Sequence, residues 1–116
     1  MENTASRNAN RRKSPRRRPR GTVRLECRKG SFGLGANLAL NLLDVSDSGV
    51  RLVLTEPLQS GAEVEVLISG YGMRDTIKRL AVVRWQVTLD TGHFCVGIEF
   101  QKRIPYRDWQ MLASPS

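Results

Sequence analysis

The stretch LALNLLDVSDSGVRLVL, residues 38–54, decides the fold of this chain. Residues 38–43 are apolar at nearly every position, which is typical of a buried strand. Residues 44–49 (DVSDSG) consist mainly of Asp, Ser and Gly, the residue types that favour turns. From residue 50 to residue 54, apolar side chains recur at every second position, which is the period of a half-buried strand. The stretch therefore predicts two strands joined by a tight turn.

The same period of two appears on both sides of this stretch. Residues 23–28 alternate Val, Leu and Cys with charged residues, and residues 64–68 place Val or Ile at every second position. Two longer apolar segments, 76–88 and 93–100, are separated by a hairpin signal at residues 89–92. About six short strands with turn signals between them favour an all-β fold, either a small barrel or a sandwich.

Three other segments complete the expected layout. Residues 29–37 carry three glycines and predict a loop between the first and second strands, and residues 70–72 (GYG) predict a turn. Near the C-terminus, Tyr106, Trp109 and Leu112 recur at intervals of three. This spacing predicts a short helix with these side chains on one face, enough to cap the mouth of a barrel.

Charge is distributed unevenly along the chain. The first thirty residues contain 11 Lys/Arg and 2 acids, a net charge of +9, whereas the rest contains 8 Lys/Arg and 9 acids, a net charge of −1. Residues 1–15 are polar and nearly free of apolar side chains, so we expect a disordered basic tail. Residues 16–116 then form one domain that includes a flexible basic arm, where an anionic partner is expected.

Several functional classes are disfavoured. No apolar run is long enough to span a membrane or to form a secretory signal, so we expect a cytoplasmic protein. Cys27 and Cys95 lack a second ligand at metal-binding spacing, which predicts two buried thiols and no metal. The one histidine, His93, has no catalytic motif around it, and no paired acids are present. We therefore expect no enzyme activity and no cofactor.

Two motifs point to a specific ligand. Arg16 and Arg20 form an Arg-x-x-x-Arg pattern just before the first strand, and Asp44, Ser46 and Gly49 form Asp-x-Ser-x-x-Gly 24 residues after Arg20. This combination resembles the PilZ family of receptors for cyclic di-GMP, a bacterial second messenger. The resemblance covers roughly residues 12–112 and implies a six-stranded antiparallel β-barrel with a short C-terminal helix.

The first motif is ambiguous in register because the arm is dense in arginine. In the family, the second arginine ends the arm and a β-branched residue three positions later opens the strand. Arg20 followed by Val23 fits this pattern, so the resemblance assigns ligand binding to Arg16 and Arg20, with Arg17 as a further candidate. The same spacing also occurs at other pairs, namely Arg12/Arg16, Arg20/Arg24 and Arg24/Arg28.

The chemistry of these residues agrees with the resemblance. Cyclic di-GMP offers two phosphates and two guanines, and a guanidinium group can bind a phosphate or the O6 and N7 acceptors of guanine. Asp44 can accept from guanine N–H groups, and Ser46 offers a small hydroxyl to phosphate or guanine. Gly49 permits a positive φ or a close backbone approach.

Our leading hypothesis is a cyclic di-GMP receptor whose arm orders on binding and thereby signals to a protein partner of unknown identity. The main alternative is a small barrel that binds nucleic acid through the basic arm. Against it, aromatic residues are few, and Trp85 and Phe100 are more simply explained as core residues. A third hypothesis is a PilZ-like adaptor that binds proteins without a nucleotide.

Overall fold

A computed structural model of the chain describes residues 16–21, 23–30, 34–70 and 75–113. The expected basic tail, residues 1–15, lies outside the described residues, as does most of the turn expected at residues 70–72. All the candidate site residues fall within the described ranges.

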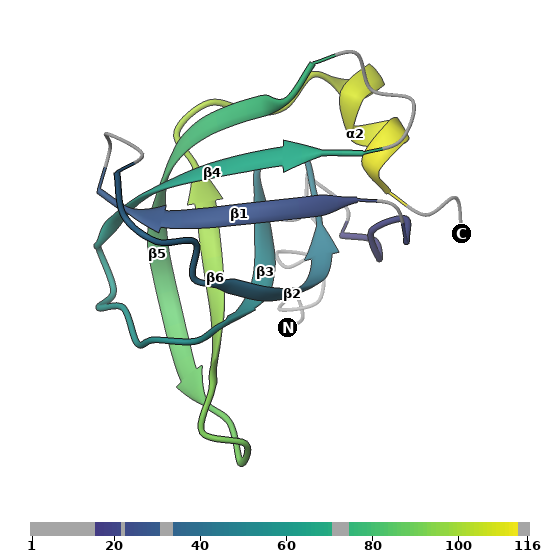
Figure 1. The fold of residues 1–116 in the computed structure, drawn as a ribbon. Helices are drawn as coiled ribbons and strands as arrows, with labels where there is room; N and C mark the ends of the chain where they lie inside the picture. Colours follow the sequence, from purple (N-terminus) through teal and green to yellow (C-terminus); the bar gives the residue numbers. More distant parts are fainter. Residues whose placement is uncertain (1–15, 22, 31–33, 71–74, 114–116) are drawn as a thin grey trace, which may run out of the picture.

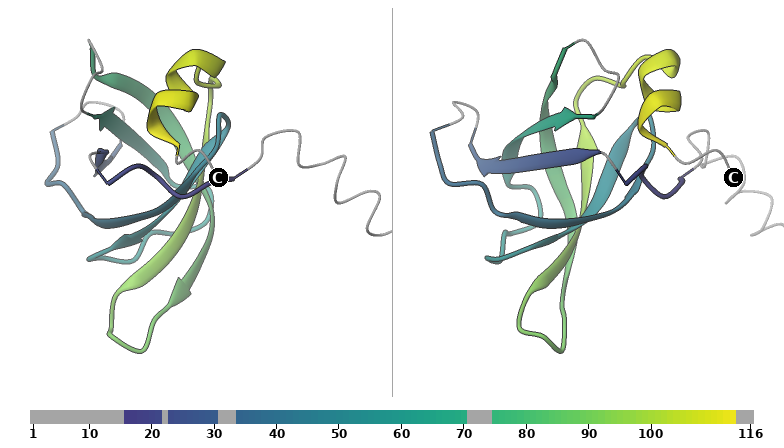
Figure 2. Two further views of the ribbon diagram at one scale, coloured as in Figure 1. Left: turned by 90° about the vertical axis from the view of Figure 1, so that its right-hand side faces the viewer. Right: turned by 45° about the vertical axis from the view of Figure 1, so that its right-hand side comes forward.

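Six antiparallel strands form a single sheet in the order β1-β4-β5-β6-β3-β2 (Figure 1). The sheet curls into a nearly closed barrel, with β1 and β2 as its two edges (Figures 1 and 2). This confirms the six-stranded antiparallel β-barrel that the resemblance implied, and it decides between the barrel and the sandwich that the sequence pattern left open. The strands are β1 (Arg24–Lys29), β2 (Ala39–Val45), β3 (Gly49–Leu54), β4 (Glu63–Ser69), β5 (Ile77–Thr88) and β6 (Phe94–Phe100).

The core lies inside this barrel and is built from the alternating apolar positions. Along β3 and β4 every second side chain points inward, because successive side chains of a strand face opposite sides. Phe100 is buried as expected, and so is Cys27, but Cys95 is only half-buried. Cys95 is therefore not the buried thiol that the sequence suggested, because it lies on the outer face of β6.

Helix α2 (Tyr106–Leu112) covers one end of the barrel, as predicted, while the β5–β6 hairpin projects at the opposite end (Figures 1 and 2). Trp109 and Leu112 are buried, but Tyr106 is 65% exposed. The expectation that all three share the buried face was wrong. At 3.6 residues per turn, positions six residues apart differ by about 120° around the helix axis, so Tyr106 turns out to solvent.

Two further expectations about burial were wrong. Trp85 was expected in the core but is 39% exposed, because a bulge between Val83 and Trp85 shifts the register of β5 and turns the indole to the outer face. The strand expected at residues 38–43 is not fully buried either, since Leu40 is 51% exposed. Its strand, β2, is an edge of the sheet, and within the described residues no strand pairs with it along its outer side.

The described part of the arm runs between the end of β2 and helix α2. Arg17 and Val45 exchange two backbone hydrogen bonds, of 3.0 and 2.8 Å. Farther along, the backbone N–H of Arg20 donates to the carbonyl of Leu112 at 2.8 Å. The arm thus joins the strand that leads into the Asp44 motif to the C-terminal helix. Within the described ranges, no helix has the length and apolar character needed to cross a membrane.

Candidate ligand-binding site

The turn of the Asp-x-Ser-x-x-Gly motif is closed by Ser46, which is 1% exposed. Its Oγ accepts from the backbone N–H of Gly49 at 3.1 Å and of Ser48 at 3.3 Å, and it donates to the carbonyl of Gly49 at 3.2 Å. A small hydroxyl side chain can make these local bonds to the backbone without distorting the turn. Ser46 therefore shapes the connection between β2 and β3.

Gly49 is required by a close approach of two backbones and not by its own dihedral angles. A Cβ on Gly49 would lie 2.2 Å from the carbonyl oxygen of Ile98 on β6. Among the described glycines, positive φ values occur only at Gly30, Gly61 and Gly92. Of the two roles expected for this residue, the close approach is the one that the structure shows.

Asp44 is the centre of an ion-pair cluster. Although it is only 7% exposed, its two carboxylate oxygens are each paired: Oδ1 with Nη1 of Arg16 at 3.0 Å, and Oδ2 with Nη2 of Arg51 at 2.7 Å. A buried carboxylate needs such partners, because it loses its strong hydration when it is removed from water. The pair between Arg16 and Asp44 joins the two sequence motifs in space.

Arg51 is a site residue that belongs to neither sequence motif. It lies directly opposite Asp44 in the β2–β3 pairing. Residues opposite each other in an antiparallel pair have neighbouring side chains, so the short turn could have revealed this contact. The site therefore contains one arginine from the arm and one from the barrel.

The other two candidate arginines lie at helix α2. The guanidinium carbon of Arg17 lies 5.3 Å from the ring centroid of Trp109, a cation–π geometry. Nη2 of Arg20 donates to the carbonyl of Gln110 at 3.2 Å. The structure thus brings Arg16 to Asp44 and leaves Arg20 on the helix, in a solvent-exposed contact.

The motif turn is also held from its other side by the segment after β6. The backbone N–H of Ile104 donates to the carbonyl of Asp47 at 2.8 Å, and the carboxylate of Asp47 pairs with Arg103 at 3.2 Å. The N–H of Phe100 donates to the carbonyl of Ser48 at 2.8 Å. These contacts join residues that are far apart in the sequence, so no local sequence pattern indicates them.

The indole of Trp85 lies on the outer face of the barrel, in the same row of cross-strand neighbours as Asp44 and Arg51. Arg51 is opposite Gly97 on β6, and Gly97 is opposite Trp85 on β5. The indole lies directly over Gly97, since a Cβ there would be 2.2 Å from Nε1 of Trp85. Asp44, Arg51 and Trp85 therefore follow one another across the sheet. In the described part of the chain, no group of His, Cys, Asp and Glu side chains could hold a metal ion.

Comparison with known proteins identifies the fold and the family. Two solved structures share the fold: the Bacillus subtilis inhibitor of motility, MotI/DgrA (TM-score 0.62, 19% identity), and the K. pneumonia MrkH–c-di-GMP complex (TM-score 0.58, 24% identity). They align with 88% and 87% of this chain, which spans about half of each of them, 47% and 48%. No curated protein sequence matches the chain. The family model of the PilZ domain matches residues 10–114 of the sequence. The chain therefore belongs to the PilZ domain family.

Proposed function

We propose that this PilZ domain is a receptor for cyclic di-GMP. The observation that carries the proposal is the ion pair between Arg16 and Asp44, which unites the arm motif and the turn motif at 3.0 Å. Membership of the PilZ family supports it, as does the shared fold with MrkH, which was solved in complex with this nucleotide.

The residues around the ion pair match the ligand's chemistry. Guanidinium groups of Arg16 and Arg20, with Arg17 as a third, bind phosphate or the acceptor edge of guanine. Asp44 accepts from the N–H groups of guanine, and the half-exposed indole of Trp85 offers a face for stacking. Ser46 and Gly49 keep the turn in place. A direct hydrogen bond from the hydroxyl of Ser46 to phosphate or guanine would add to this structural role.

Binding exchanges existing contacts of the arm for contacts with the ligand. Arg20 leaves an exposed carbonyl on helix α2, a contact of 3.2 Å that costs little to break. Arg16 turns from Asp44 to the ligand, while Arg51 stays on Asp44 and keeps the buried carboxylate compensated. The arm thereby changes its conformation beside helix α2, and a protein partner that contacts this region receives the signal.

The energies are compatible with a useful affinity. Two hydrogen-bonded charged groups contribute roughly 1.5 to 3 kcal/mol each, and ordering an arm costs roughly 2 to 5 kcal/mol. With stacking at about 1 to 3 kcal/mol per base and the polar contacts of the turn, the sum can approach the roughly −8 kcal/mol of a micromolar complex.

Calorimetric titration of cyclic di-GMP into the purified protein tests the proposal. We expect saturable binding by the wild type and a loss of about tenfold or more in affinity for Arg16→Ala and Asp44→Ala. Arg28→Ala is the matched control: it also removes an arginine paired with a carboxylate, Glu26, but at the far end of β1. Absence of heat with wild-type protein at tens of micromolar would reject the proposal.

The same titration separates the alternatives. A nucleic-acid-binding barrel would bind single-stranded RNA in preference to cyclic di-GMP, with an affinity that falls steeply as salt is raised. A protein-binding adaptor would bind neither. Cyclic di-GMP binding at moderate salt, with no comparable RNA binding, supports the receptor.

A further inference from the structure

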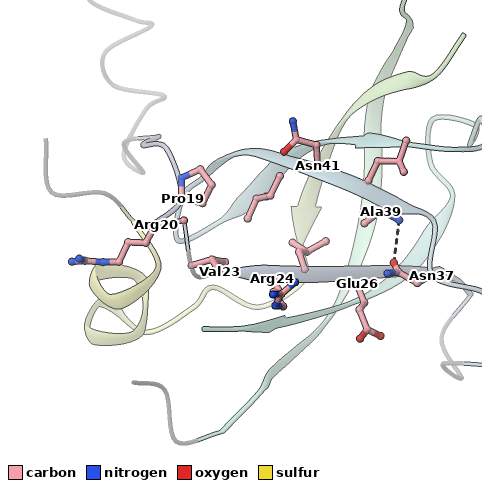
Figure 3. A pocket seen from close by; sticks show the side chains of 12 residues that line it. Pro19, Arg20, Val23, Arg24, Glu26, Asn37, Ala39 and Asn41 are labelled. Carbon is pink, nitrogen blue, oxygen red and sulfur yellow. Dashed lines mark hydrogen bonds between the residues drawn. The ribbon is translucent and has the colours of Figure 1, made fainter. Parts of the chain in front are cut away.

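The barrel has an open seam between its two edge strands. β1 and β2 end the sheet order and are not paired as strands within the described residues. They approach at one end only, where the backbone N–H of Leu38 donates to the carbonyl of Cys27 at 2.8 Å. At the same end, Oδ1 of Asn37 accepts from the N–H group of Cys27 and from that of Ala39, the latter bond being drawn in Figure 3.

Away from this closed end, the seam widens into a cleft of about 470 Å³ that also borders the arm (Figure 3). Its apolar lining includes Leu25 of β1 and Leu42 of β2, both partly buried and packed against the core. Leu40, also in the lining, is 51% exposed. The cleft therefore offers apolar side chains between two strand edges, within a lining that is polar over most of its surface.

The edge of β1 offers backbone groups to this cleft. Cys27 uses its N–H and its carbonyl on the seam side, toward Asn37 and Leu38. Alternate residues of a strand direct their backbone groups to the same side in an antiparallel pair. Leu25, two residues earlier, therefore directs its N–H and carbonyl into the cleft, where β2 does not pair with them.

The charge beside these groups is positive. Arg24 is exposed, lines the cleft, and makes no ion pair or side-chain hydrogen bond with any residue of the described structure. The one acid in the lining, Glu26, is already paired with Arg28 at 2.5 Å. The cleft thus has an uncompensated guanidinium group, which favours an acidic occupant.

We propose that this seam binds an extended acidic peptide segment of a protein partner by adding it as a strand to β1. Strand addition to an open edge obtains affinity from main-chain hydrogen bonds and specificity from alternate side chains. Apolar side chains of the segment face the floor of the cleft, and its carboxylates pair with Arg24. This site goes beyond the nucleotide site, and Arg20, which lines the cleft on its arm side, is the residue that the two sites share.

The chain itself supplies a suitable test sequence. β4, with the sequence EVEVLIS, pairs antiparallel with the other edge of β1 and alternates Glu with Val. A peptide acetyl-EVEVLIS-amide therefore has the required acidic and apolar alternation. Two control peptides are KVKVLIS, which reverses the charge, and EPEPLIS, whose prolines lack the N–H groups of a strand.

Chemical-shift mapping by NMR on the full chain, without nucleotide, tests the proposal. With EVEVLIS at up to millimolar concentration, we expect saturable shifts at the amides of Arg24, Leu25 and residues 40–42, and weaker or no shifts with either control peptide. Arg24→Glu should weaken binding by about tenfold or more. Arg107→Glu, which changes another exposed arginine that does not line the cleft, should leave it unchanged.

Each other outcome overturns the proposal. No saturable shifts with EVEVLIS would show that the seam does not accept an acidic strand. If KVKVLIS binds as well as EVEVLIS, or if the Arg24→Glu variant binds EVEVLIS as well as the wild type does, charge does not contribute to binding. If EPEPLIS binds as well as EVEVLIS, the peptide does not pair as a strand. A well-dispersed spectrum of each variant shows that it is folded.

Discussion

Gly49 lies so close to Ile98 that a Cβ on the glycine would stand 2.2 Å from the carbonyl oxygen of Ile98. This contact belongs to the pairing of β3 with β6, at the point where the motif turn enters the barrel. The obstacle is backbone, so it cannot rotate away as a side chain can. The motif glycine therefore sets how closely the turn and β6 can approach, and with it the position of the site.

Gly49→Ala should lower the free energy of unfolding by about 1 to 3 kcal/mol, because β3 and β6 must separate locally to admit the methyl group. Urea denaturation measures this change. Gly35→Ala is the control: its Cβ would meet only Lys29 backbone atoms at 3.8 and 4.0 Å, an ordinary contact. Equal stabilities of the two variants would contradict the assigned role of Gly49.

Much of the fold could be predicted because the barrel obeys a local rule. Strands β3 and β4 bury an apolar side chain at every second position, and that period is visible in the sequence. The motif turn was visible for the same reason, since Ser46 closes it through bonds to residues only two and three positions away. Local chemistry determines both features.

Contacts between distant segments could not be predicted in this way. The period of two along β5 would place Trp85 on the same face as the buried Val83, but a bulge between these two residues shifts the register, and Trp85 lies on the outer face, over Gly97. Likewise, the position of Arg20 follows from the docking of helix α2, whose carbonyl at Gln110 accepts from it. The sequence thus named the arginines of the arm but not their partners.

Gly97→Ala should have a smaller effect on stability than Gly49→Ala. The added Cβ would meet ring atoms of Trp85 at 2.2 and 2.3 Å, and this half-exposed indole can rotate away from the sheet. We expect the tryptophan emission to shift to longer wavelength as the ring enters water. The shift should be absent when Gly97→Ala is made in a Trp85→Phe background. Unchanged emission in the single variant would contradict the stacked position of the indole.

Because of Cys27, the free energy of unfolding should depend on pH in the alkaline range. Burial raises the pKa of its thiol from 9.0 to about 12. Because folding holds the thiol neutral, the stabilisation is complete below pH 9 and is lost as the pH rises from 9 toward 12. Relative to Cys27→Ala, the wild type should lose up to about 1.4 kcal/mol of unfolding free energy per pH unit in this range.

Urea denaturation of both proteins from pH 8 upward measures the difference. The control is Cys95→Ser, which removes the half-buried cysteine and should keep the alkaline dependence of the wild type. A constant difference between wild type and Cys27→Ala across pH 9 to 11 would show that the thiol does not titrate with unfolding.

Arg20→Ala should separate ligand binding from stability. In the free protein, the side chain makes one exposed hydrogen bond of 3.2 Å to Gln110, so its removal should change the unfolding free energy by no more than about 0.5 kcal/mol. In the proposed complex the same guanidinium binds phosphate or guanine, and its loss should weaken cyclic di-GMP binding by about tenfold or more. Calorimetry and urea denaturation of the same preparation measure both quantities.

The companion variant Arg24→Ala decides the register of the arm. Arg20 and Arg24 also stand four residues apart, but Arg24 lies within β1 and lines the seam. If Arg16 and Arg20 bind the nucleotide, Arg24→Ala should retain the affinity of the wild type. A loss of affinity for Arg24→Ala together with normal binding by Arg16→Ala would move the ligand from the Asp44 turn toward the seam, since Arg20 and Arg24 would then hold it from the β1 side of the arm.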